Sequence, residues 1–265
     1  KTLSGQKPGE KEKAAPAAQP AELKNYDVVF SNVSLIIGKQ AILKDFSFRF
    51  EQGKKYLIVG KNGSGKSTLF KTLKKWFADV RGTIEIGGVN VQTLSDEASS
   101  RAVSYLNENV SLFTGSVRDN ITFFSEENEN AFLQAISDAR MELNPDREIG
   151  DEGRNVSSGE QRRIEIARSL FSSAHILIFD EVVSTLDIET AFDIENLVLS
   201  YQDKTVIFVS HNFSGKLISK YDEILVMDQG EMIAHGSFED LLARCPYFRK
   251  ICEIKFGDYL PGAAK

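Results

Sequence analysis

Eight consecutive residues, Gly60 to Ser67 (GKNGSGKS), have the composition of a phosphate-binding loop. Its glycines let backbone N–H groups turn inward around an anion, and the start of the following helix adds its dipole. In the pattern G-x-x-x-x-G-K-S the lysine reaches the β- and γ-phosphates, while the serine hydroxyl takes a Mg²⁺ position. We therefore expect Lys66 and Ser67 to act in this way on a nucleoside triphosphate. The expected nucleotide-binding residues are Gly60, Lys61, Asn62, Gly63, Ser64, Gly65, Lys66, Ser67 and Thr68.

Two adjacent carboxylates follow a short apolar run. The run ILIF reads as a buried strand, and it ends in Asp180 and Glu181. Because consecutive side chains diverge at the end of a strand, Asp180 can face a magnesium ion while Glu181 faces an attacking water. A polar loop without chemistry is the alternative for such a pair taken alone. The phosphate-binding loop in the same chain favours the catalytic interpretation.

The segment VSSGEQRR allows two interpretations. Ser157 and Glu160 form the pattern S-x-x-E of a capping box, which begins a helix and needs no further function. The same helix start contains Gly159 and offers N–H groups and a positive dipole end to an anion. The residues alone favour neither interpretation.

The few histidines and cysteines give one candidate site residue. His211 follows the apolar run VIFVS, at the end of a strand where ligand sites of open α/β sheets gather. A single histidine is more often structural, and His175 and His235 have only that interpretation. Cys245 and Cys252 form neither a disulfide framework nor a metal-ligand set. Their spacing suits two turns of one helix face, so we expect both to pack in the core.

An α/β architecture would position these residues. Alternating apolar residues between Tyr26 and Phe50 predict a short antiparallel sheet. A brief apolar run, the glycine-rich loop and an amphipathic stretch through Trp76 give strand, loop and helix in the order of an α/β unit. Further apolar runs predict a largely parallel sheet buried on both faces. The expected strands of this sheet are Tyr56 to Val59, Val103 to Leu106, His175 to Phe179, Thr205 to Val209 and Glu223 to Met227.

The middle of the chain has a different pattern. Helical periodicity from Asn128 to Ala139 and from Gly159 to Leu170, with little strand pattern, predicts an inserted helical subdomain. Residues 1–24 are rich in proline and lysine and are typical of a flexible linker or tail. The expected division is therefore 1–24 linker or tail, 25–107 antiparallel β-subdomain and first part of the core, 108–163 helical subdomain, 164–256 second part of the core, and 257–265 tail.

Composition excludes several classes of protein. The chain has 265 residues, of which 42% are hydrophobic, and its 32 basic and 38 acidic residues give a net charge of −6. No overall positive field favours nucleic acid, so we expect no nucleic-acid partner. No apolar run approaches the roughly 18 residues of a membrane-spanning helix. The chain lacks an initiating Met and a signal peptide, and we expect it to be a piece of a longer protein.

Five motifs, in their order and spacing, carry a family resemblance. GKNGSGKS, VSSGEQRRIEIARSL, ILIFDE, STLD and VSH resemble the nucleotide-binding domain of an ABC transporter, over roughly Tyr26 to Phe256. LNENVSLFTGSVRDNI is similar to the exporter segment after the Q-loop, and HGSFEDLLARCPYF is similar to the exporter C-terminal helix. The resemblance implies a P-loop NTPase core, ATP and Mg²⁺ as cofactors, and ATP hydrolysis that powers export of an unknown substrate.

The resemblance also implies roles within one chain. Lys66, Glu181 and His211 would be catalytic, with Glu181 as the base that polarises water and His211 as the switch histidine near the γ-phosphate. Asp180 would organise Mg²⁺ together with Ser67.

Other implied roles depend on partners. Two such domains pair head to tail, so each ATP lies between one chain's phosphate loop and the other chain's signature. The signature residues facing the partner's ATP would be Ser157, Ser158, Gly159 and Glu160. Asp187 would cross the dimer seam. The segment from Glu108 to about Ser125 would meet the coupling helix of a transmembrane domain outside this chain, which would hold the chain at the cytoplasmic side of a membrane.

Three departures from the family pattern bear on ATP. Glu108 stands where the family usually has a glutamine, so it can bind Mg²⁺ but adds a negative charge. Ile37 aligns with the aromatic residue that stacks on adenine, and Tyr26 is the candidate substitute. Because base stacking contributes on the order of 1–3 kcal/mol, its loss would weaken ATP binding by about tenfold or more. The signature VSSGE replaces LSGGQ, with Ser158 for a glycine and Glu160 for a glutamine.

Several alternatives follow from these departures. A nucleotide-gated or regulatory ABC module with weak hydrolysis is the alternative to the exporter domain. A soluble ABC ATPase of repair or translation type is the third, although such proteins usually carry two cassettes or long coiled-coil insertions, which are not visible here. We favour a heterodimer over a homodimer, because the hydrolytic residues are intact while the signature is altered and the two serve different ATP molecules.

Overall fold

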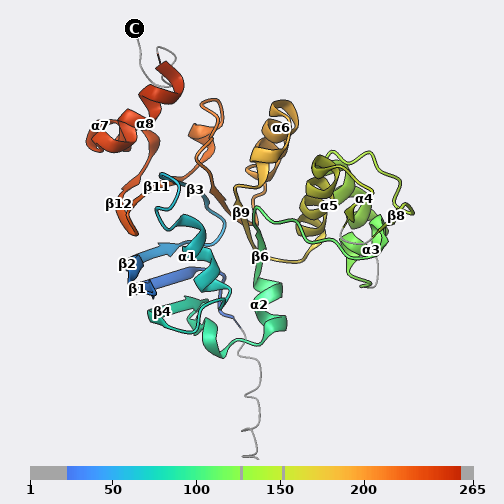
Figure 1. Ribbon diagram of the computed structural model, residues 1–265, viewed down its shortest axis with the longest axis horizontal. Helices are drawn as coiled ribbons and strands as arrows, with labels where there is room; N and C mark the ends of the chain where they lie inside the picture. The colour runs from blue at the N-terminus through green and yellow to red at the C-terminus, as the bar shows by residue number, and fades with distance from the viewer. Residues whose placement is uncertain (1–22, 126–127, 151–152, 258–265) are drawn as a thin grey trace, which may run out of the picture.

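The computed structural model describes residues 23–125, 128–150 and 153–257 (Figure 1). The expected linker 1–24 and tail 257–265 fall almost wholly outside these residues. The strands form a six-stranded sheet, a four-stranded sheet and a two-stranded pair. A mixed architecture of this kind confirms the expected fold class, an α/β core with an added antiparallel sheet.

The six-stranded sheet carries the phosphate-binding loop. In spatial order its strands are β12 (Glu231–Gly236), β11 (Glu223–Asp228), β3 (Lys55–Val59), β10 (Thr205–Val209), β9 (Ile176–Asp180) and β6 (Val103–Leu106). All are parallel to their neighbours except β12, which pairs antiparallel with β11. Every residue of β3, β9 and β10 is buried, as apolar runs between two layers require. The expected core strands are confirmed, within one residue at their ends.

The four-stranded antiparallel sheet packs on the helix after the loop. Its strands, in the order β2, β1, β4 and β5, are Gln40–Phe50, Val28–Ile37, Val80–Ile86 and Val89–Asn90. The ring of Phe50 lies 6.0 Å from that of Phe70 on α1 (Lys66–Leu73), measured between centroids. The expected helix through Trp76 ends earlier, because Lys75 adopts a left-handed backbone with φ 60°.

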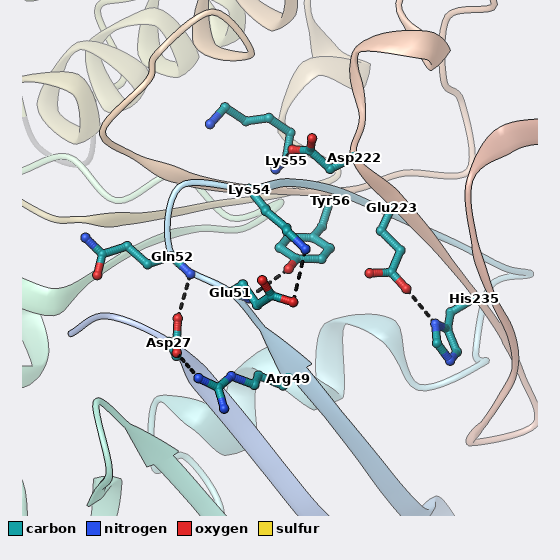
Figure 2. Close-up of polar contacts among 10 residues, drawn as sticks. All are labelled: Asp27, Arg49, Glu51, Gln52, Lys54, Lys55, Tyr56, Asp222, Glu223 and His235. Carbon is teal, nitrogen blue, oxygen red and sulfur yellow. Dashed lines mark hydrogen bonds and ion pairs between the residues drawn. The ribbon is translucent and has the colours of Figure 1, made fainter. Parts of the chain in front are cut away.

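A polar turn joins the two large sheets at the end of β3 opposite the phosphate loop (Figure 2). The Glu51 N–H donates to the Tyr56 hydroxyl at 2.7 Å, and the Gln52 N–H donates to the Asp27 carboxylate at 2.7 Å. These bonds fix the exit of β2 against the start of β3. The strand that leads into the phosphate-binding loop is therefore fixed at its start.

Three helices gather at one side of the molecule, beyond β6 and β9 (Figure 1). They are α3 (Val117–Thr122), α4 (Glu129–Asp138) and α5 (Ser158–Phe171), with the short pair β7 (Gly115–Ser116) and β8 (Glu148–Ile149) beside them. The helical periodicity correctly predicted α4 and α5. Helix α5 crosses the expected division between residues 163 and 164, and the bounds of that division stay a prediction.

The remaining helices connect the core strands and close the chain. They are α2 (Asp96–Ala102), α6 (Ile188–Val198), α7 (Phe238–Arg244) and α8 (Pro246–Phe256), and the 3₁₀ turns η1 (Val91–Thr93), η3 (Val182–Thr185) and η4 (Ile218–Lys220). Among the described residues, no helix combines the length and apolarity that crossing a membrane requires.

Two expectations about the C-terminal segment need correction. The segment resembling one exporter helix forms two, α7 and α8, because Pro246 cannot continue the hydrogen bonding of α7 and instead begins α8. Cys245 and Cys252 are both buried as expected. They do not share a helix face, because Cys245 precedes α8 and its sulfur accepts from the Phe248 N–H at 3.5 Å.

Candidate nucleotide-binding site

The loop between β3 and α1 has the backbone of an anion cradle. A Cβ atom on Gly60 would lie 2.2 Å from the Met227 carbonyl oxygen on β11, so only glycine fits there. Gly65 is the N-cap of α1 and has φ 99°, a left-handed conformation that glycine adopts without strain. The loop therefore passes close to the neighbouring strand and then turns abruptly into α1, as the motif requires.

Lys66 folds back over this loop. Its ammonium donates to the carbonyl oxygens of Gly60, at 2.9 Å, and Lys61, at 3.0 Å. The side chain is buried, and burial lowers the pKa of the ammonium, while the nearby carboxylates of Glu181 and Asp180 raise it. Gly60 and Lys61 thus serve Lys66 through their backbones and do not line the cavity themselves.

Asp180 joins three elements at the end of β9. Its Oδ1 accepts from the Ser67 hydroxyl on α1 at 2.8 Å, and its Oδ2 accepts from the Tyr105 hydroxyl on β6 at 2.7 Å. The carboxyl is 2% exposed. Burial raises its pKa, and the two donated hydrogen bonds lower it. The predicted pair of Ser67 and Asp180 is brought together, and Tyr105 is a partner that the motifs did not reveal.

These oxygens fit a magnesium ion. Mg²⁺ prefers hard oxygen ligands, and proteins usually supply one or two carboxylates while substrate phosphates and waters supply the rest. Glu108, the third expected metal residue, lines the same small space of about 10 Å³ as Ser67 and Asp180. In the described part of the chain no three His, Cys, Asp or Glu side chains form a complete metal cage. Phosphate oxygens would therefore have to complete the shell.

Glu181 and His211 contact each other across the ends of β9 and β10. Glu181 has φ 56°, a strained conformation that costs on the order of 1–3 kcal/mol for a residue with a side chain. Its N–H donates to the Val209 carbonyl at 2.9 Å. Its Oε1 accepts from the His211 N–H at 3.1 Å and lies 2.8 Å from His211 Nδ1. The strained backbone thus turns this carboxylate toward His211.

One cavity of about 390 Å³ unites most of the predicted residues. It is lined by Asn62, Gly63, Ser64, Gly65, Lys66, Ser67, Thr68, Glu108, Glu181, Thr185 and His211. Thr185 belongs to the STLD motif but was not singled out from the sequence. The cavity is large enough for a nucleotide's phosphates, and its walls come from the loop, the β6–α3 connection, and the ends of β9 and β10.

The signature residues lie away from this cavity. The Ser157 hydroxyl accepts from the Glu160 N–H at 3.3 Å, and the Glu160 carboxylate accepts from the Ser157 N–H at 2.7 Å. The capping box is therefore formed at the start of α5, and its hydrogen bonds lower the pKa of Glu160. Ser158 reaches a neighbouring cavity of about 270 Å³, also lined by Glu108. Gly159 lines neither cavity.

Three further residues considered in the sequence analysis also lie outside the cavity. Asp187 caps α6, where it accepts from the Thr190 N–H at 2.9 Å. Ile37 is 48% exposed at the end of β1. The Tyr26 ring stacks on His175, with centroids 3.7 Å apart, next to the first residue of β9 and thus at the opposite end of that strand from Asp180. This position, at the other end of the sheet from the phosphate loop, disfavours Tyr26 as the residue that stacks on adenine. His175 packs against the Tyr26 ring, in keeping with its structural interpretation.

Comparison with known proteins identifies the family. Residues 43–184, more than half of the chain, match the family described as ABC transporter. The chain belongs to this family. It is similar to a bacterial Atm1-family ABC exporter solved with ATP bound, with a TM-score of 0.81 and 29% identity over 90% of this chain and 44% of that one.

Curated relatives of this ABC domain agree. The lactococcin-A transport/processing ATP-binding protein LcnC of Lactococcus lactis subsp. lactis is 34% identical over 239 residues, which cover 86% of this chain and 33% of that protein. An ATP-dependent lipid A-core flippase of Haemophilus ducreyi is 32% identical over 243 residues, which cover 87% of this chain and 41% of that protein. The chain thus spans well under half the length of these relatives. It has the ABC ATPase fold of an exporter-type ATP-binding domain.

Tyr105→Phe tests the positioning of Asp180. Losing this donor raises the pKa of Asp180, so on acidification the carboxyl protonates at higher pH and the acid limit of Mg²⁺-dependent ATP binding moves upward. Removing an outer partner of a metal ligand also costs about tenfold in metal affinity. Titration of a fluorescent ATP analogue against pH, with Mg²⁺ or with EDTA, measures both effects.

Tyr221→Phe is the matched control, because the Tyr221 hydroxyl donates to the buried Glu195 carboxylate at 2.6 Å, away from the cavity. Its Mg²⁺-dependent profile should equal that of the unmodified chain. Identical profiles for both variants would show that Tyr105 does not position Asp180.

Proposed function

We propose that this chain powers an ABC exporter through ATP-driven pairing with a second nucleotide-binding domain. The observation that carries the proposal is the single cavity in which the phosphate loop meets Glu108, Glu181 and His211. The relatives are transport proteins, which favours export over the regulatory alternative with weak hydrolysis. The transported substrate stays open.

Each side chain would have a distinct task at this cavity. The Lys66 ammonium would leave the loop carbonyls for the β- and γ-phosphates, which offer it full negative charges. Ser67, Asp180 and Glu108 would hold Mg²⁺, which when bound would neutralise part of the phosphate charge. The Glu181 carboxylate would accept a proton from the attacking water. His211, which already contacts Glu181, would keep that carboxylate oriented and donate toward the γ-phosphate.

A groove beside the helical group suits a transmembrane partner. Its volume is about 790 Å³, and it lies between α2, β6, α3 and the end of α5. Phe123, on its wall, is 58% exposed, and the adjacent Phe124 is 71% exposed. Exposed aromatic side chains at the edge of a groove are typical of interaction sites. We propose that a coupling helix of the transmembrane domain packs here and holds the chain at the cytoplasmic side of the membrane.

The altered signature supports a heterodimer. Glu160 is an anion hydrogen-bonded at the start of α5, with Arg147 3.6 Å away. In a head-to-tail pair this carboxylate would face the partner's γ-phosphate, where it is repulsive. The site formed with this signature would bind ATP more than hydrolyse it, while this chain's own phosphate loop and Glu181 would need a better signature from a different partner.

Lys66→Ala and Glu181→Gln should separate binding from chemistry. Among the described residues that line the cavity of about 390 Å³, Lys66 is the only lysine or arginine. Lys66→Ala removes this cation, so ATP binding should weaken. Glu181→Gln keeps the shape but cannot accept a proton, so ATP should bind normally while turnover falls by about a hundredfold or more. Equilibrium binding and phosphate release measure the two effects.

Glu223→Gln is the control, because Glu223 also pairs with a histidine, His235, at a site remote from the phosphate loop (Figure 2). Its turnover should be unchanged. Hydrolysis by Glu181→Gln at the unmodified rate would show that Glu181 is not the base.

The signature hypothesis can be tested on the chain alone. With Glu181→Gln to block turnover, ATP should produce little homodimer in sedimentation velocity. Adding Ser158→Gly and Glu160→Gln should tighten dimerisation by about tenfold, because one repulsive charge close to a phosphate costs on the order of 1–2 kcal/mol. Gln keeps the capping box, so the helix start is preserved.

Adding Glu231→Gln instead makes the same charge change away from α5 and should not tighten the dimer. If the chain with its natural signature dimerises as tightly as the restored variant, the preference for a heterodimer is lost.

A further inference from the structure

A buried ion pair lies outside the cavity of about 390 Å³, on the helix that begins with the signature. Arg162 is 1% exposed, and its Nη1 lies 2.7 Å from Oε2 of Glu165, one turn along α5. Burying two charges costs several kcal/mol per ion unless further hydrogen bonds compensate. The pair must therefore make other contacts that offset this cost.

Those contacts all go to one short segment. Arg162 Nη1 donates to the Asn107 carbonyl and Nη2 donates to the Glu108 carbonyl, both at 2.6 Å. Glu165 Oε1 accepts from the Ser111 N–H at 3.4 Å. The ion pair thus holds both ends of the segment 107–111, which follows β6 and carries the Glu108 side chain into the cavity.

The chemistry of arginine matters to this arrangement. A guanidinium offers donors in a rigid planar fork, so it can bind two consecutive carbonyls and a carboxylate at once, whereas a lysine offers a point charge on a flexible stem. The Glu108 backbone is therefore fixed to α5 within hydrogen-bond distance. Any shift of the start of the segment against α5 would break at least one short bond to Arg162.

We propose that Arg162 and Glu165 are positioning residues that set the Glu108 carboxylate for the nucleotide-bound metal and tie its position to α5. This inference rests on the proposed role of Glu108 at the metal. Neither residue touches the cavity's phosphate loop, and both act through the backbone of the segment 107–111. A movement of α5 would then also move the Glu108 side chain.

The test uses the gain in ATP affinity that Mg²⁺ provides, measured with a fluorescent ATP analogue in Mg²⁺ and in EDTA. The main variant is the double substitution Arg162→Gln with Glu165→Ala, because removing both buried charges preserves the fold better than leaving one unpaired. We expect the Mg²⁺-dependent gain to fall by about tenfold, as for other lost outer partners of metal ligands. ATP affinity in EDTA should stay within about twofold of the unmodified chain. The separate variant Arg162→Lys keeps the charge but not the planar fork, so it should lose the Mg²⁺-dependent gain as well.

Two further variants separate positioning from general stability. Arg249→Gln also removes an arginine that donates to two consecutive backbone carbonyls, those of Leu242 and Ala243, but these belong to α7 and not to the segment 107–111. It should lower the melting temperature without changing the Mg²⁺-dependent gain. In a Glu108→Ala background, the double substitution should have no further effect on the gain, because its only route to the metal is gone.

An unchanged gain in the double variant would overturn the proposal, as would an equal loss in the presence and absence of Glu108. A chain that binds ATP with no Mg²⁺-dependent gain before any substitution would instead contradict the proposed metal site. The two failures are therefore distinguishable.

Discussion

The buried carboxylate of Asp180 is the interaction on which the site depends. A carboxylate that is 2% exposed needs donors, and here they come from Ser67 on α1 and Tyr105 on β6. These two hydrogen bonds join the helix after the phosphate loop to the edge strand of the parallel sheet. The loop, the end of β9 and the connection after β6 therefore have fixed relative positions before any nucleotide arrives.

Charge balance is the second constraint. Glu108 and Glu181 border the same small space as Asp180, and Lys71 is the cation beside them, while Lys66 lies on the loop. Three carboxylates around one space repel each other, and a divalent cation relieves that repulsion more than water does. A glutamine at position 108 would lower this negative charge by one. In the proposed site, this departure from the family pattern would make the arrangement more dependent on a metal ion, which would also offset the charge of the incoming phosphates.

The features that could be predicted from the sequence are those that contiguous motifs determine. The loop around Lys66, the pair Asp180 and Glu181, and the core strands depend on local pattern, and the structure has them as expected. Tyr105 was missed because its role depends on strand register, which places β6 beside β9 and is not visible in either segment alone. The position of Tyr26 was missed for the same reason, since stacking on His175 joins residues 149 positions apart. The edge strand β12 was missed because its residues are exposed or half-buried, so its sequence lacks the apolar run that marks the core strands.

Helix α5 combines both ends of the proposed mechanism. It begins with the capping box of Ser157 and Glu160, and within two turns it carries the ion pair that holds the segment of Glu108. In the proposed head-to-tail pair, a partner's nucleotide that displaced the start of α5 would also displace Arg162, which lies about one and a half turns further along the same helix. The short bonds from Arg162 would then have to move the segment 107–111 or break. In a head-to-tail pair, the two ATP sites would thus be mechanically linked through one helix of each chain, without any change in the phosphate loop itself.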